Sequence, residues 1–141
     1  MHGIFRRIGA VTTIALFVTL SVATPAFADS GGGCRNDASH PQARVCISVH
    51  SGTTDPLWSD SYINSRPLGE YRILTYVDGY CPNTGPFAVY LGNWVISGGT
   101  HSPAYPFYKP CSSSGFAYTV TEYYNSSWAY LYTAFSPTQN W

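Results

Sequence analysis

The chain has 141 residues, of which 16% are aromatic and only 10% charged, with seven basic and seven acidic side chains. This length corresponds to one ordinary domain. The few charges form no basic stripe that could neutralise phosphates, which argues against a nucleic-acid partner.

The N-terminal residues have the pattern of a secretory signal peptide. Arg6 and Arg7 precede an apolar run at 8–23, and the segment ends in the small-x-small sequence Ala26-Phe27-Ala28. The run is too short for a lasting membrane anchor. We therefore predict a signal peptide at 1–28, cleaved after Ala28. The exported chain would keep five basic against seven acidic side chains, a net charge of −2, and we expect it to be secreted and extracellular, without membrane contact.

All four cysteines, Cys34, Cys46, Cys81 and Cys111, lie in the predicted exported part. An even number in an oxidising compartment predicts two disulfides, for which three pairings are possible. We favour the sequential pairing, Cys34–Cys46 with Cys81–Cys111. Zinc is the competing interpretation, but the sequence has no C-x-x-C and no histidine at ligand spacing from a cysteine. We expect neither a metal nor another cofactor.

The exported part divides into a polar, glycine-rich segment at 29–44 and a β domain at 45–141. Residues 29–44 are expected to be an extended lead-in segment, ordered mainly by Cys34. Alternation of apolar and polar residues then predicts strands in four stretches: 45–50, 57–64, 70–79 and 86–99, the last being one long strand or two short ones around Gly92-Asn93.

Two further segments complete the predicted domain. The stretch 104–110 carries two prolines, which confine it to a sheet edge or a loop. Residues 115–135 form the strongest hairpin pattern in the chain. No helical apolar periodicity occurs outside the signal peptide. The fold class predicted is all-β, a small antiparallel β-sandwich or barrel of six to eight short strands stabilised by two disulfides.

A turn centred between Asn125 and Ser126 would fix the register of this hairpin. Phe116 would then face Phe135, with Tyr118 opposite Thr133 and Val120 opposite Leu131 on the core face. The other face would carry aromatic and small polar residues: Ala117, Thr119, Thr121, Tyr123, Trp128, Tyr130, Tyr132 and Ala134. Three interpretations of this second face are open. It is an exposed sheet stabilised by cross-strand pairs, a binding platform, or a surface covered by the lead-in segment.

The residues expected to bind a partner are Tyr123, Trp128, Tyr130 and Tyr132. No nucleophile motif, metalloprotease motif, phosphate loop or dinucleotide fingerprint is present. The acid–base candidates are scattered: His40, His50, His101, Asp55, Asp60, Asp78, Glu70 and Glu122. Among them, Glu122 is expected at the solvated rim of the core, and a buried general acid there would need a second carboxylate nearby. We therefore expect no enzymatic activity and no catalytic residue.

The general plan resembles small exported bacterial β-proteins with two sequential disulfides. The tendamistat-like amylase inhibitors are one such family, in which a Trp-Arg-Tyr loop engages the enzyme. The nearest string here is Glu70-Tyr71-Arg72, which lacks the tryptophan, so those inhibitory residues do not carry over. In architecture alone, the chain also resembles the small adaptor subunits of secreted umbrella-type toxin particles.

These observations favour a secreted, non-catalytic protein-binding module, either an adaptor in an exported, toxin-type assembly or an inhibitor of another protein. The partner would be another secreted or surface protein. The alternative is a carbohydrate-binding module that stacks polysaccharide rings on Trp128, Tyr130 and Tyr132. A planar, exposed row of these rings would favour a sugar. A tyrosine-rich surface continued by loops and the N-terminal segment would favour a protein.

Overall fold

A computed structural model describes residues 30–49, 56–96, 100–111 and 114–141. The predicted signal peptide at 1–28 lies outside these residues, as do His50 and Asp55. Among the residues described, no helix is long and apolar enough to cross a membrane.

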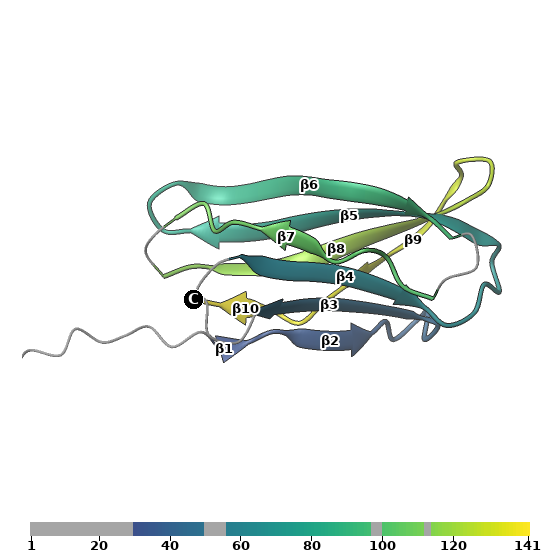
Figure 1. The fold of residues 1–141 in the computed structure, drawn as a ribbon, viewed down its shortest axis with the longest axis horizontal. Coiled ribbons are helices and arrows are strands. Elements are labelled where there is room, and N and C mark those ends of the chain that lie inside the picture. The colour runs from purple at the N-terminus through teal and green to yellow at the C-terminus, as the bar shows by residue number, and fades with distance from the viewer. Residues whose placement is uncertain (1–29, 50–55, 97–99, 112–113) are drawn as a thin grey trace, which may run out of the picture.

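The described residues form two antiparallel sheets packed face to face, which confirms the predicted β-sandwich (Figure 1). The larger sheet has the order β1-β10-β8-β5-β6, with β9 also pairing β8. Its strands are β1 (Ser30–Gly31), β5 (Glu70–Cys81), β6 (Gly85–Val95), β8 (Phe116–Asn125), β9 (Tyr130–Phe135) and β10 (Gln139–Asn140). The smaller sheet has the order β2-β3-β4-β7, formed by β2 (Gly33–Asn36), β3 (Ala43–Val49), β4 (Leu57–Ile63) and β7 (Tyr105–Phe107).

Strand alternation accounts for these elements. In β4 every second residue is buried, from Leu57 to Ile63, and the residues between them are partly exposed. The ten strands of the described residues exceed the six to eight expected, because the lead-in segment contributes β1 and β2 and the C-terminus contributes β10. Pro106 lies in β7, which pairs only with β4 at the edge of the smaller sheet, as a residue without an amide hydrogen requires.

The disulfides join Cys34 to Cys46 and Cys81 to Cys111, which is the pairing that the sequence favoured. Cys34 and Cys46 are directly opposite each other in the β2–β3 ladder, with their Cα atoms 4.0 Å apart. The second bond ties the end of β5 to the segment after β7, across a sequence separation of 30. Loops of these lengths correspond to roughly 3–4 kcal/mol of stabilisation each in the chain-entropy model.

The core has two apolar clusters between the sheets. One surrounds Tyr123, Tyr132 and Ile73 near the β8–β9 turn, and the other surrounds Val77, Leu57 and Trp141 at the opposite end. Both draw residues from each sheet, so the two sheets bury their apolar faces against each other.

Hydroxyl pairs connect the two sheets between these clusters. The Oγ of Ser59 lies 2.7 Å from Oγ1 of Thr119, and the Oγ of Ser61 lies 2.7 Å from Oγ1 of Thr121. Thr119 Oγ1 also donates to the carbonyl of Cys46 at 2.8 Å. These four hydroxyl residues are at most 1% exposed, so each pair satisfies polar atoms that would otherwise be buried without a partner.

The predicted register of the β8–β9 hairpin is wrong. Val120 faces Phe135 instead of Leu131, and Tyr123 faces Tyr132. The turn is centred about two residues later than expected because Asn125 organises it: its side-chain oxygen accepts bonds from the amides of Ser127 and Ala129, both at 2.9 Å. Trp128 has a positive φ of 62° in this turn. The β8–β9 ladder itself has a register shift between Tyr123 and Tyr124.

The inner and outer faces of the hairpin are also opposite to the prediction. Thr119, Thr121 and Tyr123 point into the sandwich and are fully buried. Tyr123 donates to the carbonyl of Tyr62 at 3.1 Å, and Tyr132 donates to Oε1 of the buried Glu70 at 3.1 Å. Their phenol groups thus have partners inside, so Tyr123 and Tyr132 are core residues. The lead-in segment reaches Tyr132, since the ring of His40 stacks on the Tyr132 ring with their centres 3.8 Å apart.

The two tyrosines Tyr130 and Tyr132 give a matched test of this arrangement. We expect Tyr132→Thr to lower the free energy of unfolding by roughly 3–5 kcal/mol, the cost of truncating a large buried aromatic side chain. Tyr130 is 57% exposed, so Tyr130→Thr should change it by about 0.5 kcal/mol or less. Urea unfolding of the oxidised proteins measures both. Equal losses in the two variants would contradict the register.

A double-mutant cycle tests the hydroxyl pair of Ser61 and Thr121. Thr121→Val leaves the Ser61 hydroxyl buried without its partner, which should cost about 1–3 kcal/mol of unfolding free energy. Adding Ser61→Ala removes that unpaired hydroxyl, so the double variant should be more stable than Thr121→Val alone. Strict additivity of the two single losses in urea unfolding would show that the hydroxyls do not interact.

Candidate functional site

The candidate site is the face of the larger sheet that points away from the smaller sheet, here called the outer face. On β5 the inward positions Ile73, Thr75 and Val77 are at most 1% exposed, so the residues between them point outward. The ladders of β5 with β6 and β8, and of β8 with β9, identify the other outward positions. The outer face comprises Arg72, Leu74, Tyr76, Asp78, Tyr80, Pro86, Ala88, Tyr90, Asn93, Val95, Phe116, Tyr118, Val120, Glu122, Tyr124, Tyr130, Thr133 and Phe135.

Aromatic rings dominate this face, and several are well exposed. Tyr90 is 51% exposed, and Tyr80, Phe116, Tyr130 and Phe135 are also among the exposed large side chains. Clustered exposed apolar side chains mark an interaction surface more often than isolated ones do. Val120, by contrast, is only 9% exposed on the same face, between its ladder partners Tyr76 and Phe135.

At one end of the outer face, Arg72 and Trp128 form a cation–π pair next to the hairpin tip. The guanidinium carbon of Arg72 lies 3.9 Å from the centre of the Trp128 ring. Tyr124 meets Trp128 and Tyr130 edge to face, at 5.9 and 5.8 Å. Figure 1 shows this turn extending beyond the body of the sandwich, at the end opposite the C-terminus. The contacts hold Trp128 in a defined position although half of its surface is exposed.

Glu122 lies on the outer face and not at the rim of the core, which corrects the prediction. It is opposite Leu74 on β5 and Thr133 on β9. Its Oε2 accepts a hydrogen bond of 2.8 Å from the Tyr124 hydroxyl. This bond to a carboxylate, together with burial and the negative charge of Glu122, raises the pKa of Tyr124 to about 12.

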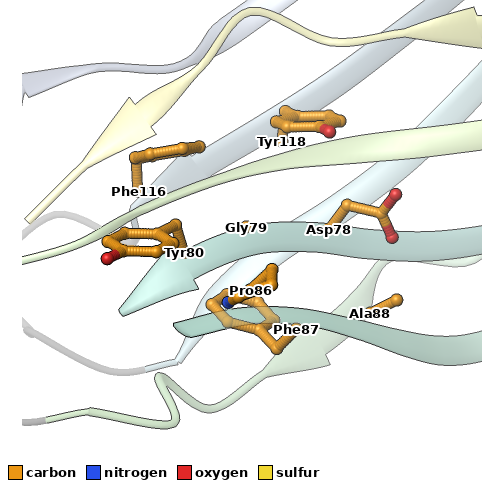
Figure 2. Close-up of a pocket in the computed structure, with 8 residues that line it drawn as sticks. All are labelled: Asp78, Gly79, Tyr80, Pro86, Phe87, Ala88, Phe116 and Tyr118. Carbon is orange, nitrogen blue, oxygen red and sulfur yellow. The ribbon is translucent and has the colours of Figure 1, made fainter. Parts of the chain in front are cut away.

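At the opposite end, a hollow of about 500 Å³ opens around Asp78 (Figure 2). Its lining is mainly aromatic and apolar: Tyr80, Pro86, Phe87, Ala88, Phe116 and Tyr118, with the backbone of Gly79. Gly79 must lack a side chain, because a Cβ there would lie 2.2 Å from the carbonyl oxygen of Phe116 and 2.5 Å from the Phe87 ring. Burial raises the pKa of Asp78 above its ordinary value.

The structure separates the four predicted binding residues. Trp128 and Tyr130 are exposed at the hairpin tip, 52% and 57% respectively, whereas Tyr123 and Tyr132 are in the core. The row of rings that would stack a sugar on Trp128, Tyr130 and Tyr132 is therefore not formed. The prediction missed the outward tyrosines of β5, although the alternation in 70–79 contained the signal: Ile73 and Val77 fall on one face, and Tyr76 falls on the other.

The acid–base candidates within the described residues are dispersed, and Glu70, Glu122 and His40 are engaged in structural contacts. Glu70 accepts bonds from Gln42 Nε2 and the Leu68 amide, both at 3.0 Å, besides the bond from Tyr132. His40 Nδ1 lies 3.0 Å from Asp37 Oδ1. In the part of the chain that the structure describes, no group of three or more His, Cys, Asp or Glu side chains could hold a metal ion.

Comparison of the chain with protein-family models, curated proteins and solved structures found no match. Function must therefore be inferred from the chemistry of the outer face itself.

The Tyr124–Glu122 bond predicts an alkaline titration. The pKa of Tyr124 in the folded protein, about 12, is above the ordinary value of 10.0. The contribution of this bond to the stability of the folded protein is therefore fully present below pH 10 and is lost as the pH rises through about 12. NMR titration of ¹³C-labelled tyrosine rings measures it, with Tyr124→Phe assigning the signal. Glu122→Gln should move the Tyr124 pKa back towards its ordinary value. A wild-type Tyr124 that titrates near 10 would contradict the geometry.

Proposed function

We propose that this chain is a secreted, non-catalytic protein-binding module, an adaptor or an inhibitor, which binds its partner protein through the outer face. The observation that carries this proposal is the tyrosine-rich outer face on paired strands, with Tyr90 and Tyr130 more than half exposed. Tyrosine provides a large, rigid contact area with a polar tip at little cost in conformational entropy, and it is enriched at protein interfaces.

The orientation of the rings supports a protein partner over a flat polysaccharide. Tyr76 and Tyr90 are tilted by 57°, and Tyr124 and Tyr130 by 75°. These rings present both faces and edges, which suits the irregular surface of a protein. A polysaccharide chain would require rings in one plane. The few charges on this face also fit the core of a protein interface, from which charged residues are depleted.

Secretion is part of the same proposal. Two disulfides are compatible with an extracellular protein, since disulfides persist in oxidising compartments. The N-terminal sequence at 1–28 supports it independently through its basic, apolar and small-residue regions.

A carbohydrate-binding function is the second candidate, and one local feature favours it. The rings of Tyr80 and Phe116 are nearly parallel, at 23° and 6.1 Å, and Asp78 lines the same hollow (Figure 2). An aromatic platform next to a carboxylate can hold a sugar ring and accept its hydroxyl hydrogens.

Matched tyrosine variants test the proposed function. The wild-type protein and two variants are immobilised and exposed to native culture supernatant, and the dissociation constant of a retained protein is then measured with purified material. Tyr90→Thr/Tyr130→Thr alters the outer face, whereas Tyr108→Thr alters a tyrosine that is 70% exposed after β7 of the smaller sheet. We expect the outer-face variant to lose about 2 kcal/mol or more of binding free energy, the scale of an interface hot spot, and Tyr108→Thr to bind normally.

Two outcomes would contradict the proposal. Equal binding by the outer-face variant would place the interface elsewhere. Retention of the wild-type protein on polysaccharide, without a protein at fixed stoichiometry, would favour the second candidate. Near-ultraviolet circular dichroism of each variant verifies that the sandwich is intact.

A further inference from the structure

We propose that the hollow beside Asp78 receives a positively charged side chain, arginine or lysine, from the partner protein. This inference rests on the proposed function and specifies the chemistry of one contact within it. It is carried by three features of the hollow: a carboxylate with which none of the described residues is paired, aromatic side chains around it, and the apolar surface of Pro86 and Ala88.

The Asp78 carboxylate differs from those of Asp37 and Glu70 in its hydrogen bonds. Asp37 and Glu70 both accept several hydrogen bonds from their own chain. Among the described residues, by contrast, neither a donor nor a cation is paired with Asp78. Burial is the cause of its raised pKa. Its acceptor capacity is therefore available to a ligand. A partly buried carboxylate gains most from a donor that also carries the opposite charge.

The walls of the hollow suit a cation with an aliphatic stem. Figure 2 shows the rings of Tyr80, Phe116 and Tyr118 grouped on the same side of the sheet as the Asp78 side chain. The faces of such rings attract an ammonium or guanidinium group. Pro86 and Ala88 from β6 supply apolar surface, against which the methylene groups of lysine or arginine can pack.

The charge pattern of the outer face points the same way. The nearest outward charge along β8 is another carboxylate, Glu122, whose Oε2 is occupied by Tyr124. The outward cation on β5 is Arg72, which is six residues from Asp78 and lies over Trp128. Charge complementarity with the Asp78 carboxylate therefore favours a positive group on the partner.

A neutral sugar is the competing ligand, and charge separates the two. Asp78→Asn keeps the size of the side chain and a carbonyl oxygen that can accept hydroxyl hydrogens, but it removes the negative charge. Binding of a cation should depend on that charge, whereas binding of a sugar should tolerate its loss.

The test uses peptides as probes in an NMR titration of the oxidised, ¹⁵N-labelled protein. The probe is acetyl-Gly-Arg-Gly-amide, and its neutral counterpart replaces arginine with citrulline. We expect saturable shifts of the amides at 78–80, 87–88 and 116–118, with the citrulline peptide weaker by about tenfold or more, the scale of a lost hydrogen bond to a charged group. Asp78→Asn should weaken the arginine peptide by about the same factor. The matched control Asp60→Asn, on β4 of the smaller sheet, should leave it unchanged.

Three results would overturn the inference: no saturable shift at the hollow, equal binding of the arginine and citrulline peptides, or unchanged binding by Asp78→Asn. Shifts at the same amides produced by maltohexaose or cellohexaose, and retained in Asp78→Asn, would assign the hollow to a glycan. The proposed function is tested separately. If Tyr90→Thr/Tyr130→Thr loses the partner and Asp78→Asn does not, the outer face is the interface and only the cation contact is wrong.

Discussion

The hydroxyl pairs Ser59–Thr119 and Ser61–Thr121 determine which face of β8 lies inside the sandwich. Each pair joins a residue of the smaller sheet to one of the larger sheet, at 2.7 Å in both cases. Turning β8 over would move Thr119 and Thr121 into solvent and leave Ser59 and Ser61 buried opposite Tyr118, Val120 and Glu122. Each unpaired buried hydroxyl would cost about 1–3 kcal/mol, which is a large share of the stability of a domain this size.

The same constraint produces the surface for which we propose a binding role. With small hydroxyl residues turned inward, the bulky alternate residues of β8 must point outward, beside Tyr76 and Tyr80 of β5. The interior accommodates Tyr123 and Tyr132 because Tyr62 and Glu70 supply acceptors for their hydroxyls. The core therefore contains polar side chains and the outer face carries aromatic ones, whereas hydrophobicity alone would place the aromatic side chains inside. Because these aromatic side chains point outward, they are available to form the contacts around Trp128 and the hollow around Asp78.

The sandwich and the disulfide pairing can be predicted from the sequence, because alternation and cysteine spacing are local signals. The sequence places Val120 and Phe135 on the same face of the hairpin, as the structure does, but the face predicted to be the core is the outer one. The inward direction of Thr119 depends on Ser59, which lies 60 residues away, and no local pattern contains that contact. The turn centre depends on the side chain of Asn125 and the positive φ of Trp128. The outward tyrosines of β5 were accessible from the sequence, since Tyr76 and Val77 alternate in a segment already identified as a strand.

The inward direction of the β8 threonines and of Tyr123 is the central claim, and solvent access to individual tyrosines tests it most directly. Hydroxyl-radical footprinting of the oxidised protein, with residue-resolved mass spectrometry, gives the oxidation rate of each ring. The structure predicts rapid oxidation of Tyr90 and Tyr130, which are more than half exposed, and strong protection of Tyr123 and Tyr132, which are at most 4% exposed. Oxidation of Tyr123 and Tyr132 at the rates of Tyr90 and Tyr130 would show that β8 is turned over and that the outer face lies elsewhere.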